Sequence, residues 1–446
     1  MKFAVRKRNM TPDHPVFLAG FGARTKKSEG VLDELYVKTV LLRNHRDLLV
    51  IALDALGCDR GFTDGIKTHL GERFGLLPEQ ILIQFSHTHA SVYLTGEHPE
   101  LRRGNYSMGQ EGWSDDPDAI DYTEDIQYYR KLRDAIAEMT AQCMDDLQDG
   151  ELSIGFGKSM AAVNRRLVTD RGVRMAPNGE AEIDRDLTVL SIHNREGELR
   201  AILFSIACHP TAMGPGNNKI SAEFVGRACR RLEEAHPGAV AFFLQGCAAD
   251  LKPAKSAEGG SFTALSPEQM YAAGDELADE TERVIRAAAF QPVSGPFDTA
   301  LTEVLLDIEA MELTDIERWA RSQGAYYERA VSRLQRLAEQ GKIKTSYSLA
   351  IQAWQLSDNV RLIALESEIP TGYSLRLKTL FPDQKLIVLG YSNSVYTYIP
   401  TETILEQGGY EADHPLTAGF AGRFAKGTEE KIIRAADRLC SSLGKS

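Results

Sequence analysis

The sequence predicts an α/β protein in which mixed β-sheets are flanked by helices. Short apolar runs alternate with longer helical patterns along the chain, which is the rhythm of βαβ units. The 446 residues are 43% hydrophobic and 26% charged, as in an ordinary globular protein with a large core. Because no repeat, low-complexity segment or linker interrupts this pattern, we expect a single domain over residues 1–446.

The elements follow from the position of each run. The apolar run 48–54 predicts a buried strand, residues 62–75 a helix and the run 81–85 the next strand. Residues 99–118 are polar and are typical of a long surface loop, whereas residues 119–147 predict a helix. Further strands are expected near 151–157, 187–193, 200–208, 240–244, 361–365 and 385–391, and further helices over 223–235, 267–289 and 428–443. Residues 311–357 are rich in Glu, Arg, Ala, Gln and Leu, which favours an inserted helical hairpin.

The charge and the ends of the chain exclude several classes of partner. A formal net charge of −12 argues against nucleic acid and against anionic lipid surfaces. The sequence has no apolar run of about eighteen residues that would predict a membrane helix. Its N-terminus, MKFAVRKRNMTPDHP, lacks the apolar core of a secretion signal. The six scattered cysteines form no CxxC pair and are expected to be free buried thiols. We therefore expect a cytoplasmic protein without a membrane anchor; the sequence does not specify its oligomeric state.

Reactive side chains follow the predicted strands. His87 and His89 stand two residues apart after the run 81–85, and in a strand such residues point to the same side. Two imidazoles facing one space are costly in a core and useful for a metal. Other apolar runs lead into Asp54, His209, Cys247 with Asp250, Glu366 with Glu368, and Tyr396 with Tyr398. Because the carboxyl ends of parallel strands share one edge of a sheet, we expect these groups to meet there.

Imidazole nitrogen and carboxylate oxygen are ligands that suit zinc. Two histidines and one carboxylate leave a position for water, whose pKa falls to about 7 on zinc, and this favours hydrolysis of an amide or ester. Alternation alone does not separate Glu366 from Glu368 as the ligand, since both face the same side of a strand. The alternatives are a hydrogen-bonded pair of structural histidines and a cysteine hydrolase that uses Cys247 with His209.

Short motifs in a fixed order give the chain a resemblance to a known family. They are AGFG (19–22), SHTH (86–89), VNR (163–165), HPTAM (209–213), QGCAAD with LKP (245–253), ESEIPTG (366–372), SNSVYTYIPTE (392–402) and GGYEA (408–412). Together they are similar to the neutral/alkaline, non-lysosomal ceramidase family. Members of that family are zinc-dependent amidases that cleave the N-acyl bond of ceramide. The resemblance implies a ceramidase-like catalytic domain, Zn²⁺ as cofactor, and a small-molecule or lipid N-acyl substrate.

The resemblance also implies roles for particular residues. It makes His87, His209, Glu368 and Tyr398 the metal ligands. His89 would lie beside the substrate and assist proton transfer.

Four further positions are implied to face the substrate. Arg165 and Tyr410 would hold the oxyanion that develops on the scissile carbonyl. Asp250 and Lys252 would lie in the substrate-binding region. Lys252 stands where the family has a serine, and a lysine can pair with a carboxylate, phosphate or sulfate; alternatively, it turns outward to solvent.

Two other departures concern the substrate. Ala90 follows the SHTH motif where the family continues with serine and a Gly-Pro turn. The family's C-terminal β-sandwich and secretion signal have no counterpart in this chain, which also lacks a basic amphipathic helix for a bilayer. These departures favour a soluble N-acyl compound, such as an acylated amino sugar, over ceramide. The alternative from another class is a ligand-binding protein of the same fold without catalysis.

Overall fold

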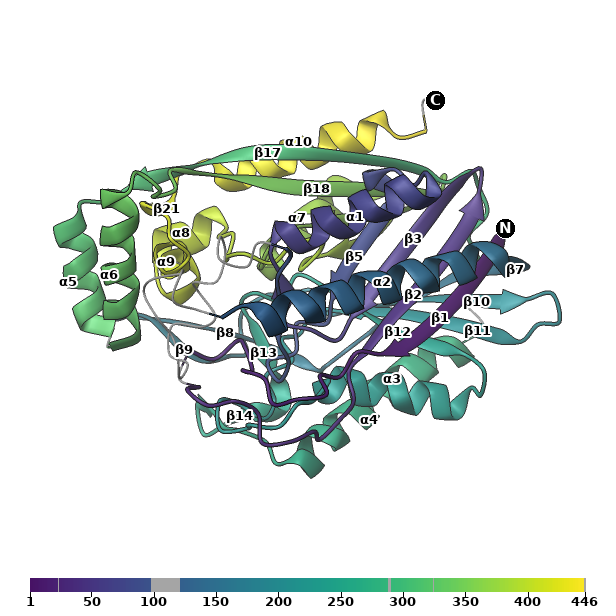
Figure 1. Ribbon diagram of the computed structural model, residues 1–446, viewed down its shortest axis with the longest axis horizontal. Helices are drawn as coiled ribbons and strands as arrows, with labels where there is room; N and C mark the ends of the chain where they lie inside the picture. The colour runs from purple at the N-terminus through teal and green to yellow at the C-terminus, as the bar shows by residue number, and fades with distance from the viewer. Residues whose placement is uncertain (23, 98–120, 288–289, 324, 445–446) are drawn as a thin grey trace.

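Two large mixed sheets form the centre of the molecule. The computed structural model describes residues 1–22, 24–97, 121–287, 290–323 and 325–444 (Figure 1), so the loop expected at 99–118 lies outside the described residues. Within these ranges one sheet has nine strands in the order β12-β11-β10-β7-β1-β2-β3-β5, with β16 beside β7. The other has five described strands in the order β20-β19-β18-β17-β21.

The strand bounds are as follows. The first sheet contains β1 (Lys2–Asn9), β2 (Tyr36–Asn44), β3 (Arg46–Leu53), β5 (Ile81–Phe85), β7 (Gln148–Lys158), β10 (Asp186–Asn194), β11 (Leu199–Ile206), β12 (Val240–Gln245) and β16 (Gln291–Pro292). The second contains β17 (Asp298–Ala310), β18 (Ser346–Ser357), β19 (Val360–Leu365), β20 (Lys385–Leu389) and β21 (Gly422–Phe424). Smaller sheets join β13 (Leu251–Pro253), β8 (Ala162–Thr169) and β9 (Gly172–Asn178); β14 (Ala257–Glu258) and β15 (Ser261–Phe262); and β4 (Gly57–Cys58) and β6 (Tyr93–Leu94).

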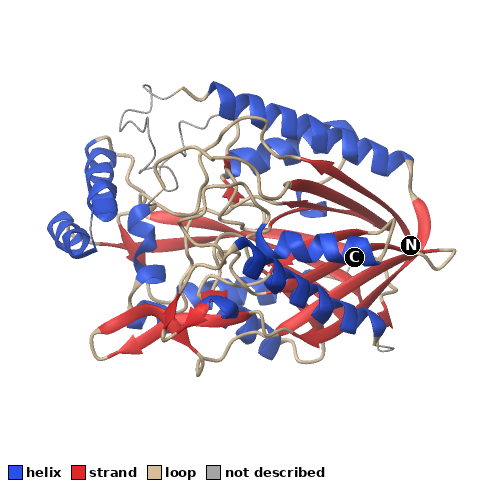
Figure 2. Ribbon diagram, turned by 90° about the horizontal axis from the view of Figure 1, so that it is seen from below, coloured by secondary structure: helices blue, strands red, loops and turns tan. Residues whose placement is uncertain are grey.

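Helices cover the outer faces of the two sheets (Figure 2). They are α1 (Arg60–Phe74), α2 (Thr123–Asp145), α3 (Glu223–Ala235), α4 (Pro267–Arg286), α5 (Leu313–Gln323), α6 (Ala325–Glu339), α7 (Thr371–Leu380), α8 (Glu402–Gln407), α9 (Tyr410–Thr417) and α10 (Thr428–Ser442). The short 3₁₀ turns 78–80 and 254–256 complete the set of described helices. No helix in the described ranges is long and apolar enough to cross a membrane.

The layers explain the apolar runs of the sequence. On β3, Leu49 and Ile51 pack toward the helices of the first sheet, whereas Leu48 and Val50 join a second core between the sheets. That second core also contains Trp354 and other residues of the five-stranded sheet, so the two sheets face each other. A strand buried on both faces reads as a continuous apolar run instead of an alternating one. The predicted α/β class with mixed sheets and flanking helices is confirmed.

The helical insertion is confirmed only in part. Helices α5 and α6 form a hairpin at one end of the molecule (Figure 1). Residues 346–357, which we expected to continue this hairpin, instead form β18. Along β18, Leu349 and Ile351 face the core beneath α10, and Trp354 and Leu356 face the other sheet. A composition rich in Ala, Gln and Leu suits a helix, but here tertiary burial of both faces decides the conformation.

Parallel strand pairs bring the predicted strand ends together. Strands β3 and β5 are joined by α1, β11 and β12 by α3, and β19 and β20 by α7, and each pair is parallel. The sheets are also bridged next to these ends, by Gln84 with Ser392 and by Gly246 with Leu389. The carboxyl ends of β5, β11 and β19 therefore lie in one region, as sites in α/β proteins require.

A buried ion pair ties this region together. Arg60, at the start of α1, holds the Glu366 carboxylate with two hydrogen bonds of 2.9 and 2.6 Å. Glu366 is buried and also accepts a 2.7 Å hydrogen bond from the Ala350 main-chain N–H.

We expect Arg60→Met to lower the free energy of unfolding by about 3–5 kcal/mol, because it leaves the buried Glu366 carboxylate without its cation. Urea unfolding measures the loss. The double variant Arg60→Met/Glu366→Gln removes the stranded charge and keeps an acceptor for Ala350, so it should recover most of the stability. If Arg60→Met lowers the free energy of unfolding by less than about 1 kcal/mol, the ion pair contributes no more than a surface salt bridge, which would contradict this prediction.

Candidate metal centre

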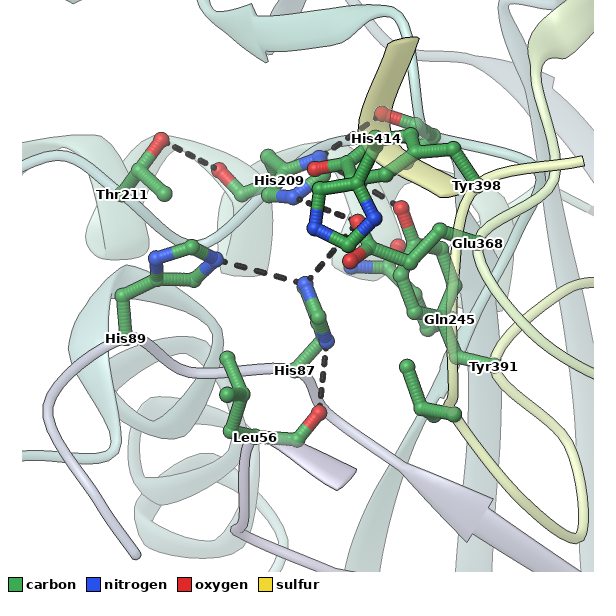
Figure 3. A network of polar contacts seen from close by, with 12 residues as sticks. Leu56, His87, His89, His209, Thr211, Gln245, Glu368, Tyr391, Tyr398 and His414 are labelled. Atoms are coloured by element: carbon green, nitrogen blue, oxygen red, sulfur yellow. Dashed lines mark hydrogen bonds and ion pairs between the residues drawn. The ribbon is translucent and has the colours of Figure 1, made fainter. Parts of the chain in front are cut away.

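Three histidines and one carboxylate meet at the strand ends (Figure 3). His87 and His89 follow β5, His209 follows β11, and Glu368 follows β19. Nε2 of His87 and Nε2 of His209 each lie 3.3 Å from Oε2 of Glu368. Nε2 of His89 lies 3.3 Å from Nε2 of His87. All four side chains are buried, so the expectation that both imidazoles of the HxH pair face one space is confirmed.

Main-chain carbonyls orient two of the rings. Nδ1 of His87 is 2.5 Å from the Leu56 carbonyl oxygen, and Nδ1 of His209 is 2.8 Å from that of Ala248. A carbonyl only accepts, so in each ring Nδ1 carries the hydrogen and donates it. In a neutral imidazole the lone pair is then on Nε2, which here points at a carboxylate oxygen.

This arrangement fits a cation. Lone pairs and a carboxylate oxygen repel one another at 3.3 Å unless a positive charge lies between them. Nε2 of His209 is buried and makes no hydrogen bond with any described residue. Histidines that donate one ring N–H to a carbonyl and offer the other nitrogen are the usual form of metal-bound histidine. The residues present therefore fit a metal site of two histidines and one carboxylate, with a third histidine adjacent.

The protonation states agree with this assignment. Burial lowers the pKa of His209 to about 4 and holds that of His89 well below its ordinary value. Both rings are therefore neutral at pH 7, which is the form that binds metals.

Left-handed residues after the strands aim these side chains. His87, Ser367 and Tyr391 have φ values of 63°, 74° and 51°, which non-glycine residues rarely adopt. Ser367 breaks the alternation of the strand, so Glu366 turns to Arg60 while Glu368 turns to the histidines. The expectation that Glu366 and Glu368 face the same side is wrong for this reason, and the geometry selects Glu368.

Tyr398 is placed beside Glu368 by the main chain. The two residues form a parallel bridge, with the Glu368 N–H donating to Thr397 at 3.0 Å. The Tyr398 hydroxyl accepts a 3.2 Å hydrogen bond from Nη2 of Arg165. Tyr398 therefore joins the metal cluster to Arg165.

Arg165 lies between two aromatic rings. Its guanidinium carbon is 5.5 Å from the ring centres of both Tyr398 and Tyr410, and its Nε donates to Glu411 at 2.9 Å. Arg166 holds the other oxygen of Glu411. Burial opposes the charge on Arg165, but Tyr398 and Glu411 outweigh it and raise its pKa. The predicted polar pair Arg165 and Tyr410 is thus assembled next to Tyr398.

The two remaining predicted residues differ in their surroundings. Asp250 is buried, and its two carboxylate oxygens accept hydrogen bonds from the Asn164 side chain at 3.0 Å and the Thr371 N–H at 2.8 Å. Its carbonyl accepts the Arg165 N–H at 2.8 Å. The hydrogen bonds of Asp250 therefore fix the main chain next to Arg165. Lys252 is half-buried on β13, with Nζ 5.2 Å from the centre of the Phe262 ring.

Some strand-end residues do not reach the centre. Asp54 accepts the N–H of Tyr36 at 2.9 Å, and the Tyr396 hydroxyl donates to the Ala418 carbonyl at 2.8 Å. Cys247 packs in the core of the five-stranded sheet, where burial raises the pKa of its thiol. A thiol of this kind is protonated at neutral pH, which disfavours the cysteine-hydrolase interpretation. The six cysteines are free and buried, as predicted.

Three residues at the centre were not predicted. The Tyr391 ring lies 4.4 Å from that of His87, and its hydroxyl lies 3.4 Å from Nδ1 of His209. His414 lies 4.8 Å from the Tyr398 ring. Gly20 packs so closely that a Cβ atom there would lie 2.4 Å from Nδ1 of His89. Tyr391 ends the expected strand 385–391 and Gly20 lies in the AGFG motif, so both could have been considered, whereas nothing in the sequence marks His414.

The fold and the site together define an α/β protein with two facing mixed sheets and a buried histidine–carboxylate cluster suited to a metal. No protein-family model matches the chain, and no curated protein matches its sequence. Solved structures do: a neutral ceramidase from Pseudomonas aeruginosa superimposes with a TM-score of 0.73 at 18% identity, over 99% of this chain and 74% of the other. A ceramidase complexed with C2 gives 0.75 at 16% identity, over 99% and 75%. The chain therefore has the neutral ceramidase fold.

Metal analysis tests the ligand assignment. We expect about one zinc per chain in the wild-type protein, as in a mononuclear site, and its loss in His87→Ala, His209→Ala and Glu368→Ala. His89→Ala should retain zinc if His89 is not a ligand. Elemental analysis after reconstitution and dialysis measures the content.

His236→Ala is the control, because His236 pairs with Glu282 on the outer helices. Zinc should also raise the melting temperature of the wild type but not of the ligand variants. Absence of zinc from the reconstituted wild type, or its retention in His209→Ala, would contradict the assignment.

Proposed function

We propose that this chain is a zinc-dependent hydrolase that cleaves a linear N-acyl amide bond, as a distant member of the neutral ceramidase family. The observation that carries the proposal is the convergence of His87, His209 and Glu368 beside Tyr398 within this fold. These four residues would hold the ion. When bound, Zn²⁺ supplies a Lewis acid that activates water and polarises the amide carbonyl.

His89 is assigned to proton transfer. Its Nε2 lies 3.3 Å from Nε2 of His87, so the ring faces the space where the ion and its water would lie. Its main-chain carbonyl accepts a hydrogen bond from Arg24, and its ring packs at a tilt against Phe21, with 4.8 Å between the ring centres. These contacts fix the ring, and a fixed neutral imidazole can take a proton from water and return it to the leaving amine.

Arg165 is assigned to the carbonyl oxygen. Its Nε and Nη2 are engaged by Glu411 and Tyr398, whereas Nη1 makes no hydrogen bond with a described residue. A fixed cation with a free N–H stabilises negative charge that develops on the oxygen during attack. Tyr410, which is 36% exposed, lies over the same guanidinium and would close the substrate side.

Hydrolysis of N-acyl compounds is the direct test. The zinc-loaded wild type is expected to release acid and amine in equal amounts, chelation should abolish the release, and zinc should restore it. A panel from short acylated amino sugars to ceramide ranks the soluble substrates that we favour against the lipid. Binding without turnover across the panel, at full zinc occupancy, would instead indicate a ligand-binding protein.

The proton-transfer role predicts the effect of one small substitution. Gly20→Ala should displace His89, because its Cβ would lie 2.4 Å from Nδ1. We expect kcat to fall by roughly 10²-fold with zinc content unchanged, since misplacement by an ångström is enough for such a loss.

Gly172→Ala is the matched control. Gly172 also has a positive φ, of 104°, but nothing lies within 4 Å of its added Cβ. Gly172→Ala should therefore lower the free energy of unfolding, because alanine is strained at a positive φ, but it should leave kcat unchanged. Equal kcat in the two variants would argue against the assignment of His89.

A further inference from the structure

Lys252 shares a face of the small sheet with Arg165. On β13 it pairs with Val163 of β8 in antiparallel register, and Val163 and Arg165 are two residues apart. The ladder continues beyond the strand, because the Arg165 N–H donates to Asp250 at 2.8 Å. Lys252 and Arg165 are therefore diagonal neighbours, at a typical separation of about 7–8 Å.

The ammonium of Lys252 makes no direct ion pair with a described carboxylate. Among the described residues its ammonium makes no hydrogen bond or ion pair; its recorded neighbour is the face of Phe262. Burial, followed by the charge of Arg165, lowers the pKa of Lys252 to about 8, and the Glu223 carboxylate opposes this only in part, so Lys252 still carries its proton at pH 7. Two other half-buried lysines contrast with it, since Lys7 and Lys378 each hold a carboxylate at 2.6 Å.

The carboxylates near Lys252 are committed elsewhere. Glu411 holds both Arg165 and Arg166, and the oxygens of Asp250 are occupied by protein donors. Glu223 accepts the N–H of Met213 at 3.0 Å, and burial raises the pKa of its carboxyl group to about 7. None of them forms an ion pair with Lys252 in the described structure. An anion from outside the chain is the group that would complete this site.

We propose that Lys252 binds an anionic group, a carboxylate, sulfate or phosphate, carried by the substrate close to its scissile amide. The inference rests on the proposed hydrolase function and narrows its substrate class to acidic N-acyl compounds. The path from Lys252 through Arg165 and Tyr398 to Glu368 places the anion on the Arg165 side of the metal centre. A half-buried ammonium strengthens such a contact, because water competes less for the charge.

A matched substrate pair tests the charge. The zinc-loaded wild type is given an N-acyl amino acid and its primary amide, which has the same size and no charge. For the acid, Lys252→Met should raise KM by about tenfold or more and change kcat less than threefold, as expected for the loss of one charge-assisted hydrogen bond. For the amide, Lys252→Met should not raise KM, because no charge on that compound pairs with Lys252 and the substitution removes a cation that its complex leaves unpaired.

Lys255→Met is the control, since Lys255 pairs with Glu276 on the surface. It should leave both substrates unaffected. N-acyl compounds that carry a sulfonate or a phosphonate in place of the carboxylate show which anion gives the lowest KM. Lys252→Glu should reverse the preference toward a cationic analogue, which keeps the test decisive if Lys252→Met folds poorly.

Calorimetry separates failure of this inference from failure of the proposed function. Binding of the acid to zinc-free wild-type protein, weakened at least tenfold in Lys252→Met, would support the anion site even without turnover. Wild-type hydrolysis of acid and amide with equal KM, both unaffected by Lys252→Met, would overturn the anion site and leave the hydrolase proposal standing. If the wild type cleaves neither compound and binds the acid no better than the amide, both fail.

Discussion

The hydrogen bonds from His87 and His209 to the main-chain carbonyls of Leu56 and Ala248 determine the chemistry of this centre. They place the ring hydrogens on Nδ1 and direct both Nε2 lone pairs at the Glu368 carboxylate. Without a cation, these groups would repel one another inside the protein. Such a buried repulsion lowers the free energy of unfolding. The fold thus orients both Nε2 atoms and the carboxylate oxygen toward one position that suits a cation.

Such a centre requires unusual backbone, and the sheets supply the rigidity to hold it. Residues in the left-handed region cost about 1–3 kcal/mol each, and His87, Ser367 and Tyr391 all adopt it at the centre. Each follows or begins an element of a βαβ unit, whose strands are buried on both faces. The two facing sheets and the helices on their outer faces form four packed layers. The free energy of this packing compensates for the local strain at the strand ends, where the side chains converge.

The same double burial explains what could be predicted from the sequence. Strands buried on both faces appear as apolar runs, so their ends, and with them His87, His209 and Glu368, could be located. The separation of Glu366 from Glu368 could not, because it depends on one left-handed serine, Ser367, which no local pattern marks. The contact of Gly20 with His89 was equally hidden, since it joins an N-terminal loop to a strand end across the fold.

Charge distinguishes the surroundings of this centre from the rest of an acidic chain. The protein carries a formal charge of −12, yet Arg165 and Lys252 lie next to each other beside the cluster, and Glu411 offsets Arg165 and Arg166 alone. A ligand bound against Lys252 would displace water from its ammonium group. A neutral lipid amide makes no charged contact that replaces the lost hydration of the ammonium, whereas an anion does. Selectivity would then come from the cost imposed on neutral ligands as much as from attraction to charged ones, because an unmatched buried cation penalises every complex that leaves it unpaired.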